Sequence, residues 1–128
     1  MGDFRDLRAW RSARELAVLS RPAIQKLPSY ERFALADQWR RASYSVVLNI
    51  AEGASRRGSR EFRRYLEIAR ASLHELEAIL DLVGALGYLS VEEVTPLEAV
   101  RADCAKMVFG LIRRLDAKPT VRRSDVAS

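Results

Sequence analysis

The sequence has very few of the side chains from which metal sites, disulfides and catalytic centres are built. It contains one cysteine, Cys104, and one histidine, His74. A single cysteine excludes a disulfide within the chain and favours a reducing compartment, so we expect a cytoplasmic protein. Because one cysteine and one histidine cannot complete a zinc site, we expect neither a metal ion nor another cofactor.

Long apolar runs are also missing. No stretch approaches the roughly 18 apolar residues of a membrane span, and the charged start MGDFRDLRAW lacks the apolar core of a signal peptide. We therefore expect a chain that has no membrane partner. Its 128 residues are enough for one domain with a real core and too few for two.

The alternation that marks a half-buried strand is absent, whereas four segments show the spacing of helices. The clearest helix starts with Ser59 as its expected N-cap and stops at Gly87. Two apolar stripes run along it, which predicts neighbours on two sides. The main stripe is Phe62, Leu66, Ala69, Leu73, Leu76, Leu80 and Val83, and the second is Tyr65, Ser72, Ile79 and Leu86.

Two further helices precede this one. The first contains Pro22, which we expect to bend or end it near Ser20 or Arg21. The second begins near Ser29 and ends at Gly53. Their predicted core residues are Leu7, Trp10, Ala13, Ala17 and Ile24 in the first helix, and Leu35, Trp39, Ala42, Val46 and Ile50 in the second.

The last helix has two possible starts, because Ser90 to Glu93 and Thr95 to Glu98 both fit a capping box. Short connections predict an all-α fold, an antiparallel up-down-up-down four-helix bundle over residues 1–116. The stretch AKPTVRRSDVAS, residues 117–128, lacks periodicity and predicts a mobile basic tail. The core stripe predicted for the last helix is Leu97, Val100, Cys104, Met107, Leu111 and Leu115.

Lysine is scarce, and the arginines that replace it are unevenly distributed. The net charge of +5 includes 19 Arg and only 3 Lys. Residues 1–14, 53–70 and 106–128 carry +2, +4 and +4, whereas residues 71–100 contain no Lys or Arg. An up-down-up-down topology would gather the three basic segments at one end of the molecule.

Five of these arginines fall within nine positions, 56 to 64. Three of the five occupy the first turns of a predicted helix, where the helix dipole disfavours cations. Two interpretations stay open: a solvated turn partly neutralised by Glu61 and Glu67, or a surface for a polyanion, with RNA foremost. The predicted nucleic-acid-binding residues are Arg56, Arg57, Arg60, Arg63, Arg64, Arg5, Arg8, Arg113 and Arg114.

We find no candidate for catalysis. The stretch GASRRG lacks both the preceding strand and the GK[ST] ending of a P-loop. Cys104 falls in a core stripe with no base nearby in sequence, and His74 is expected on a helix surface. Asn49 is expected either to cap or crosslink backbone at the helix end near Gly53, or to fix the register between helices.

Long stretches of the chain resemble a known family. They are FRDLRAWRSARELA from Phe4, residues 35–80, and LGYLS from Leu86, with NIAEG (Asn49, Ile50, Ala51, Glu52, Gly53) as the most specific motif. They resemble the four-helix-bundle proteins encoded in intervening sequences of bacterial 23S ribosomal RNA genes. This chain departs from the common pattern at Pro22, Trp39 and Val47.

The resemblance implies a bundle that assembles with itself as a ring, with a pentamer the known state in relatives. The family is similar in fold to the accessory variability determinant of diversity-generating retroelements, which binds nucleic acid and a reverse transcriptase through a basic surface. We therefore expect a non-enzymatic homo-oligomer that binds RNA or another nucleic acid. The alternative is a scaffold that docks a protein partner without nucleic acid.

Overall fold

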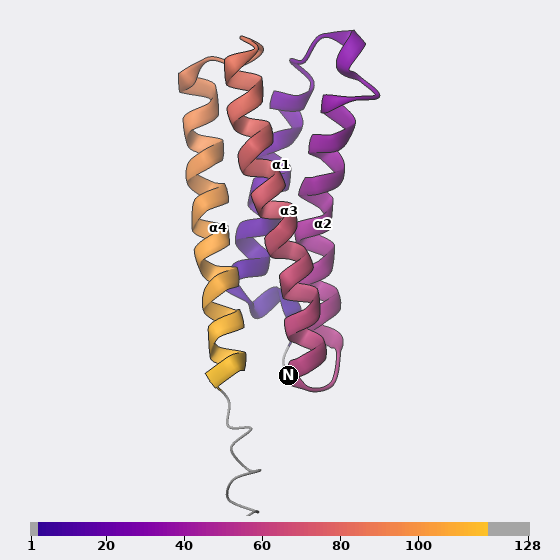
Figure 1. The fold of residues 1–128 in the computed structure, drawn as a ribbon, viewed down its shortest axis with the longest axis vertical. Coiled ribbons are helices and arrows are strands. Elements are labelled where there is room, and N and C mark those ends of the chain that lie inside the picture. The colour runs from indigo at the N-terminus through magenta and orange to yellow at the C-terminus, as the bar shows by residue number, and fades with distance from the viewer. Residues whose placement is uncertain (1–2, 118–128) are drawn as a thin grey trace, which may run out of the picture.

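A computed structural model describes residues 3–117, which form four long antiparallel helices (Figure 1). They are α1 (Arg8–Ile24), α2 (Leu35–Ser55), α3 (Ser59–Ala85) and α4 (Val91–Ala117), with short 3-10 helices η1 (Phe4–Asp6) and η2 (Ser29–Glu31). No strand occurs within residues 3–117. The predicted all-α four-helix bundle is confirmed. The predicted basic tail lies, from residue 118 onwards, outside the described residues.

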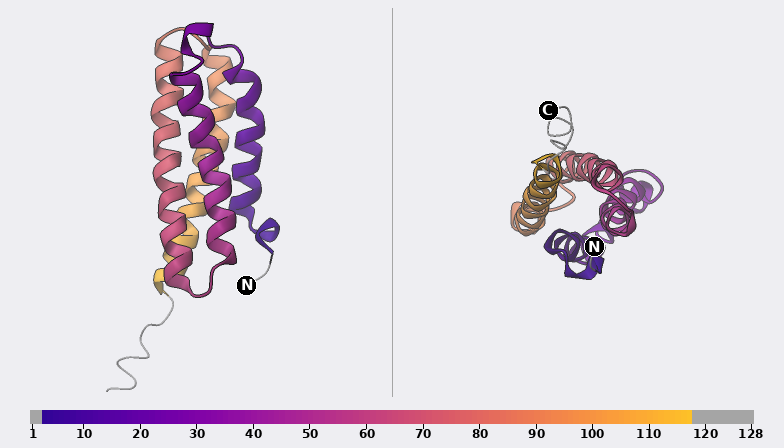
Figure 2. Two further views of the ribbon diagram at one scale, coloured as in Figure 1. Left: turned by 90° about the vertical axis from the view of Figure 1, so that its right-hand side faces the viewer. Right: turned by 90° about the horizontal axis from the view of Figure 1, so that it is seen from below.

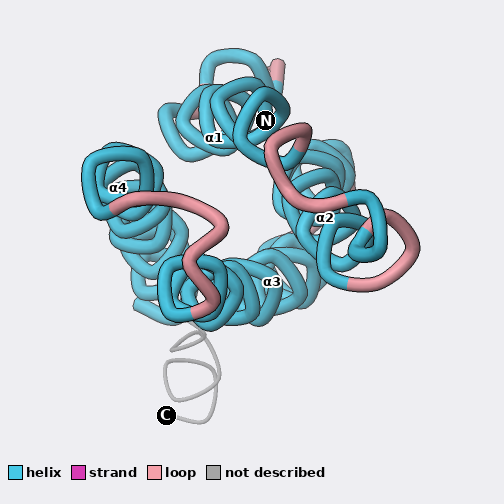
Figure 3. Tube along the Cα trace, turned by 90° about the horizontal axis from the view of Figure 1, so that it is seen from above, coloured by secondary structure: helices cyan, strands magenta, loops and turns pink. Residues whose placement is uncertain are grey.

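The helices follow one another around the bundle, so that each packs against two neighbours (Figure 3). The side chains that fill the centre include Trp39, Phe62 and Leu66, all at most 2% exposed. Every residue of the main stripe predicted for α3 is buried. The central part of the second stripe, Ser72 and Ile79, is buried as well, whereas Leu86 is 48% exposed.

The core stripes of α1 and α4 are rotated from the predicted ones. In α1 the buried residues are Ala9, Ala13, Leu16, Ser20 and Ala23. Ala17 and Ile24 instead line a groove between α1 and α2. The core thus combines small alanines of α1 with the much larger Trp39 of α2, which is completely buried.

In α4 the buried residues are Leu97, Arg101, Cys104, Val108 and Ile112. Arg101 replaces Val100 in the predicted stripe because its charge is compensated. Its Nε and Nη2 each donate to the Glu98 carboxylate at 2.7 Å, and Glu77 of α3 lies 3.6 Å from Nη2. A buried charge that is paired in this way can take a core position.

The boundaries of α1 and α2 correct the sequence analysis. Pro22 does not end α1, which continues to Ile24 because Ala23 in that last turn is buried. Helix α2 begins at Leu35 and not near Ser29, since Ser29 lies in η2. The carboxylate of Glu31 accepts the Leu35 N–H at 3.3 Å and so caps the later start.

Two turns decide how the later helices connect. Gly58, with φ 83°, occupies the N-cap position of α3 that was predicted for Ser59, because the chain reverses there through a positive φ. Gly87, with φ 76°, terminates α3 as predicted: its N–H donates to Gly84 and the Tyr88 N–H to Val83, a Schellman motif.

The start of α4 uses the first of the two predicted capping boxes. The Glu93 N–H donates to Ser90 Oγ at 3.2 Å, and the Ser90 N–H donates to the Glu93 carboxylate at 2.8 Å. Pro96 consequently lies inside α4. No described helix combines the length and the low charge needed to cross a bilayer.

Candidate nucleic-acid interface

Three segments far apart in sequence meet at one end of the bundle. Figures 1 and 2 show η1 with the start of α1, the α2–α3 turn and the end of α4 at the same end. We call this end the basic pole and define it by the nine predicted arginines: Arg5, Arg8, Arg56, Arg57, Arg60, Arg63, Arg64, Arg113 and Arg114. The fold therefore brings together all the residues that the sequence analysis selected.

The centre of the basic pole is the tight turn between α2 and α3. Helix α2 ends at Ser55, two residues after the predicted end at Gly53, and Arg56 then adopts an extended conformation. Its N–H still donates to the Gly53 carbonyl at 3.1 Å. Arg57 and Gly58 complete the turn, so three chain positions reverse its direction and leave Arg57 exposed.

Four of the nine arginines form ion pairs. Arg56 lies 2.5 Å from Glu52, Arg5 2.8 Å from Asp3, and Arg64 3.4 Å from Glu61. Arg63 reaches across from α3 to Asp116 of α4 at 2.7 Å and also approaches Glu67 at 3.5 Å. All these side chains are at least 40% exposed. Such pairs contribute little to stability and exchange readily with other anions.

The other five arginines of the basic pole form no ion pair within residues 3–117: Arg8, Arg57, Arg60, Arg113 and Arg114. Arg8 and Arg114 line a hollow of about 330 Å³ between the start of α1 and the end of α4. Lys106 and Asp6 line the same hollow. The sequence analysis did not select Lys106, although its position two turns before Arg113 on one helix could have indicated it.

Aromatic rings lie among the arginines, a feature that the sequence analysis missed. The guanidinium carbons of Arg64 and Arg56 lie 4.5 and 5.3 Å from the centre of the Tyr65 ring. Arg5 lies 4.5 Å from the ring of Phe4, which packs edge-on against Trp10. Further along the α3–α4 face, Phe109 has two arginines on its ring, Arg70 at 5.0 Å and Arg113 at 5.8 Å.

The NIAEG motif lies directly behind the turn. An added Cβ at Gly53 would lie 2.9 Å from Cδ1 of Phe62 and 2.9 Å from Cβ of Tyr65, so α3 approaches α2 closely here. Asn49 does not bond backbone near Gly53; its Nδ2 donates to the Ser45 carbonyl at 2.8 Å, one turn earlier. The same Nδ2 lies 3.1 Å from Ser45 Oγ, which accepts a bond from Ser72 of α3 at 2.8 Å. Both bonds of Asn49 stay within α2, and the bond that crosses to α3 is the one from Ser72 to Ser45, so a role of Asn49 in helix register stays a prediction.

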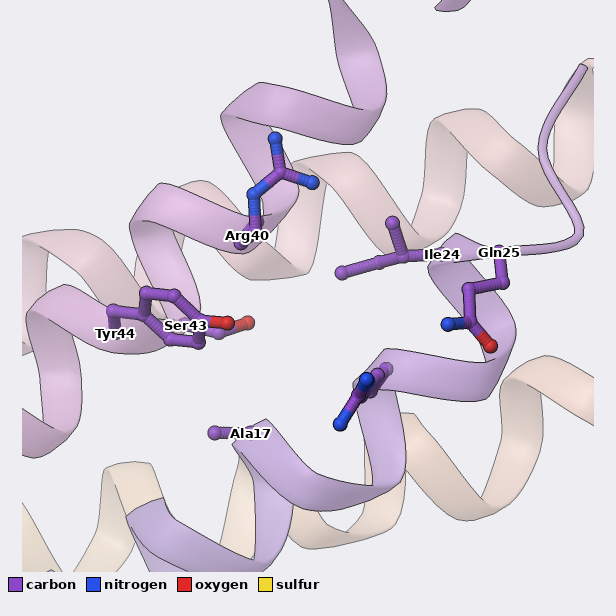
Figure 4. Close-up of a pocket in the computed structure, with 7 residues that line it drawn as sticks. Ala17, Ile24, Gln25, Arg40, Ser43 and Tyr44 are labelled. Carbon is purple, nitrogen blue, oxygen red and sulfur yellow. The ribbon is translucent and has the colours of Figure 1, made fainter. Parts of the chain in front are cut away.

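The groove between α1 and α2 is the next feature with polar side chains. It has a volume of about 440 Å³ and is lined by Arg21, Gln25, Arg40, Ser43 and Tyr44 together with Ala17 and Ile24. Figure 4 shows the oxygens of Ser43 and Tyr44 facing this groove. No histidine or carboxylate lines it, so a base that could activate the Ser43 hydroxyl is lacking there.

The remaining candidates for chemistry lie elsewhere. Cys104 is completely buried, and burial raises the pKa of its thiol to about 11. His74 is exposed on α3 with its Nδ1 3.6 Å from Glu77. The part of the chain that the structure describes contains no group of three His, Cys, Asp or Glu side chains that could hold a metal ion.

The arrangement defines a class of protein, an antiparallel four-helix bundle with one basic end. The family model of the 23S rRNA-intervening sequence protein matches residues 5–110, and the chain belongs to this family. Among solved structures, a protein of unknown function from the S23 ribosomal protein family of Bacteroides thetaiotaomicron is similar, with a TM-score of 0.76 and 22% sequence identity. The match covers 81% of this chain and 97% of that chain, and it supports the fold alone. Comparison with curated proteins gives no match.

Proposed function

We propose that the protein is a non-enzymatic RNA-binding bundle that holds the phosphate backbone with its basic pole. One observation carries the proposal: three distant segments place nine arginines at one end, and five of them form no ion pair among the described residues. Guanidinium groups bind phosphate oxygens in a planar fork, and each contact releases counterions from the nucleic acid. The same surface would accept other nucleic acids through the same contacts.

The placement of three arginines supports a role in binding over a role in folding. Arg60, Arg63 and Arg64 lie in the first two turns of α3, where the free N–H groups already make the helix end electropositive. Cations are unfavourable at such an end by about 0.3–1 kcal/mol each. Only one acid, Glu61, lies in the first turn to compensate. A phosphate would satisfy both the arginines and the helix terminus.

A charge-matched pair of variants tests the proposal. Arg57→Glu with Arg60→Glu changes the basic pole, and Arg21→Glu with Arg32→Glu changes two exposed arginines elsewhere. Each pair removes four charge units from +5 and leaves +1. We expect gel-shift titrations against salt to show weaker RNA binding, and a salt slope lower by about 1 per lost phosphate contact, for the pole variant only. Equal losses in both pairs would show a bulk charge effect and contradict the proposal.

A protein scaffold is the second candidate function, because at the end opposite the basic pole the α3–α4 side is acidic, whereas Arg21, Lys26 and Arg32 lie on its α1–α2 side. Residues 71–100 contain no Lys or Arg, and Glu75, Asp81 and Glu92 are exposed there. An acidic protein could dock on the basic pole, or a basic one on the opposite end. Purification at low salt without nucleic acid, together with one stoichiometric protein partner, would favour the scaffold.

We also propose that the chain assembles with itself, as a ring with a pentamer as the expected state. Apolar side chains on the outside of α2 support this: Tyr44 is 52% and Leu48 64% exposed, one turn apart. The second stripe of α3 gives little support to assembly. Its central residues, Ser72 and Ile79, are already buried within the chain, and Ser72 bonds to α2. A ring would set several basic poles side by side, and weak phosphate contacts would then act together.

A further inference from the structure

Arginine side chains stack on aromatic rings at three places around the basic pole. The rings are Phe4, Tyr65 and Phe109, and arginines lie 4.5 to 5.8 Å from their centres. Tyr65 has Arg56 from the α2–α3 turn and Arg64 from α3 on its ring. Phe109 has Arg70 from α3 and Arg113 from α4. Tyr65 lies on α3 beside the α2–α3 turn, and Phe109 lies on α4.

Among these three rings, Phe109 is the one that packing leaves exposed. It is 43% exposed on α4 and does not belong to the buried core. Burying an apolar side chain of this size is favourable by about 1.5–3 kcal/mol, so an exposed phenylalanine gives up stability that an inward position would provide. Arg70 from α3 and Arg113 from α4 flank it, and within residues 3–117 Arg113 has no carboxylate partner.

A ring flanked by cations is the arrangement that binds unpaired bases. A base stacks on an aromatic ring or on a guanidinium plane, while neighbouring cations hold the phosphates on either side. Double-stranded RNA offers no free base faces, and proteins recognise it by its shape, phosphates and 2′-hydroxyls. Arginines alone would therefore serve a duplex, whereas an exposed ring beside them can stack only on the bases of a single strand.

We infer that the ligand of the basic pole is a single-stranded segment of RNA, and that Phe109 stacks against one of its bases. The inference rests on the proposed function and names the class of RNA. Arg113 and Arg70 hold the phosphates that flank the stacked base. Tyr65, only half-buried between Arg56 and Arg64, provides a second stacking surface beside the α2–α3 turn.

The test compares Phe109→Leu with a matched control at the opposite end of the bundle. Phe33 also has an arginine on its ring, Arg32 at 5.1 Å, and is 85% exposed. Phe33→Leu therefore removes the same ring from a similar stack outside the basic pole. Both variants are titrated with a short oligoadenosine strand and with the duplex that it forms with oligouridine.

We expect Phe109→Leu to weaken single-strand binding by about five- to hundredfold and to leave duplex binding unchanged. Phe109→Trp should restore single-strand affinity, and its emission should be quenched by the strand. Phe33→Leu should change neither affinity. Unchanged single-strand binding in Phe109→Leu, or an equal loss for the duplex, would overturn the stacking role.

The two proposals fail in different ways. If Arg57→Glu with Arg60→Glu abolishes RNA binding while Phe109→Leu has no effect, the basic pole binds RNA and the stacking inference is wrong. If the unaltered protein binds neither the strand nor the duplex, both proposals are overturned.

Discussion

Gly53 is the residue at which the sequence of α2 most directly sets the spacing of two helices. It lies inside α2, and α3 approaches it so closely that a Cβ would lie within 3.0 Å of Phe62 and Tyr65. Tyr65 meets it with its own Cβ, which cannot move unless the α3 backbone moves. The glycine that looked in sequence like a helix end is thus a contact point, and only the folded neighbour reveals it.

Gly53→Ala should therefore destabilise the bundle, whereas Gly110→Ala should not. Overpacking at a backbone contact lowers the free energy of unfolding by about 1–3 kcal/mol. Gly110 has nothing within 4 Å of an added Cβ, so alanine there should raise stability by up to about 1 kcal/mol through helix propensity. Urea unfolding of both variants measures the difference. Equal stabilities would contradict the close approach of α3.

Cys104 provides a second test at the scale of a residue. Its thiol has no exposed surface, and burial raises its pKa to about 11. We expect iodoacetamide to modify it at pH 8 only as fast as the chain unfolds, and rapidly in urea. The unfolded thiol ionises near its ordinary pKa of 9.0, so its contribution to stability is complete below pH 9 and is lost as pH rises toward 11. Cys104→Ala should remove this part of the alkaline dependence.

At the scale of helices, the capping box at the start of α4 is joined to the segment after α1 through Lys26, which pairs with Glu93. The ammonium of Lys26 and the N–H of Ser90 lower the pKa of Glu93 to about 2. Glu93 thus anchors the acidic end of α4 in two directions, to its own backbone and to the segment after α1.

Glu93→Ala should lower the melting temperature at neutral pH, and Glu93→Gln should lower it less because glutamine keeps the capping bond. A carboxylate with a lowered pKa stabilises the fold above its unfolded pKa of about 4.5, and that contribution is lost as pH falls toward 2. Glu93→Ala should keep the deficit of the lost capping bond at pH 2, whereas the difference between Glu93→Gln and the unaltered chain should disappear over this range. A difference between Glu93→Gln and the unaltered chain that persists at pH 2 would show that packing and not charge is responsible.

Helix number, direction and the core of α2 and α3 could be predicted because their apolar spacing is regular. The stripes of α1 and α4 could not, since a charged Arg101 fills a core position of α4 and small residues, Ala9, Ala13 and Ser20, take core positions of α1. The start of α2 was placed early because Pro28 and Ser29 resemble a helix start, while the cap comes from Glu31, which also accepts a bond from Tyr88. The core faces of α1 and α4 and the start of α2 are therefore decided by contacts between residues that are distant in sequence.

For the whole molecule, topology is what turned three basic segments into one basic pole. The charges of the three segments, together with the antiparallel order of the helices, were sufficient to predict that one end of the bundle is basic. It could not predict which arginines form ion pairs or which aromatic rings lie beside them, because Arg63–Asp116 and Arg70–Phe109 join different helices. These details depend on which face of α4 is turned toward the core, and the apolar spacing of α4 alone predicts a different face.

Self-assembly is tested by placing a charge on the outer face of α2. Leu48 and Val18 are both 64% exposed, on α2 and α1, so Leu48→Glu and Val18→Glu are matched in exposure. We expect Leu48→Glu to dissociate the assembly, by sedimentation and native mass measurement, and Val18→Glu to leave it intact. RNA affinity should fall with dissociation, because single poles bind weakly. An unaltered chain that sediments as a monomer would contradict assembly.

The positions of the two chain ends have a practical consequence for such measurements. The start of η1 and the end of α4 both lie at the basic pole (Figure 2), so a purification tag or fluorophore attached directly before residue 3 or after residue 117 would begin at the surface under study. A polyhistidine tag would add cations of its own there. Because Cys104 is inaccessible, a single cysteine placed at Ala85, the exposed last residue of α3, would be the one reactive thiol of the described chain. Immobilisation through that thiol would present every arginine of the pole to the solution.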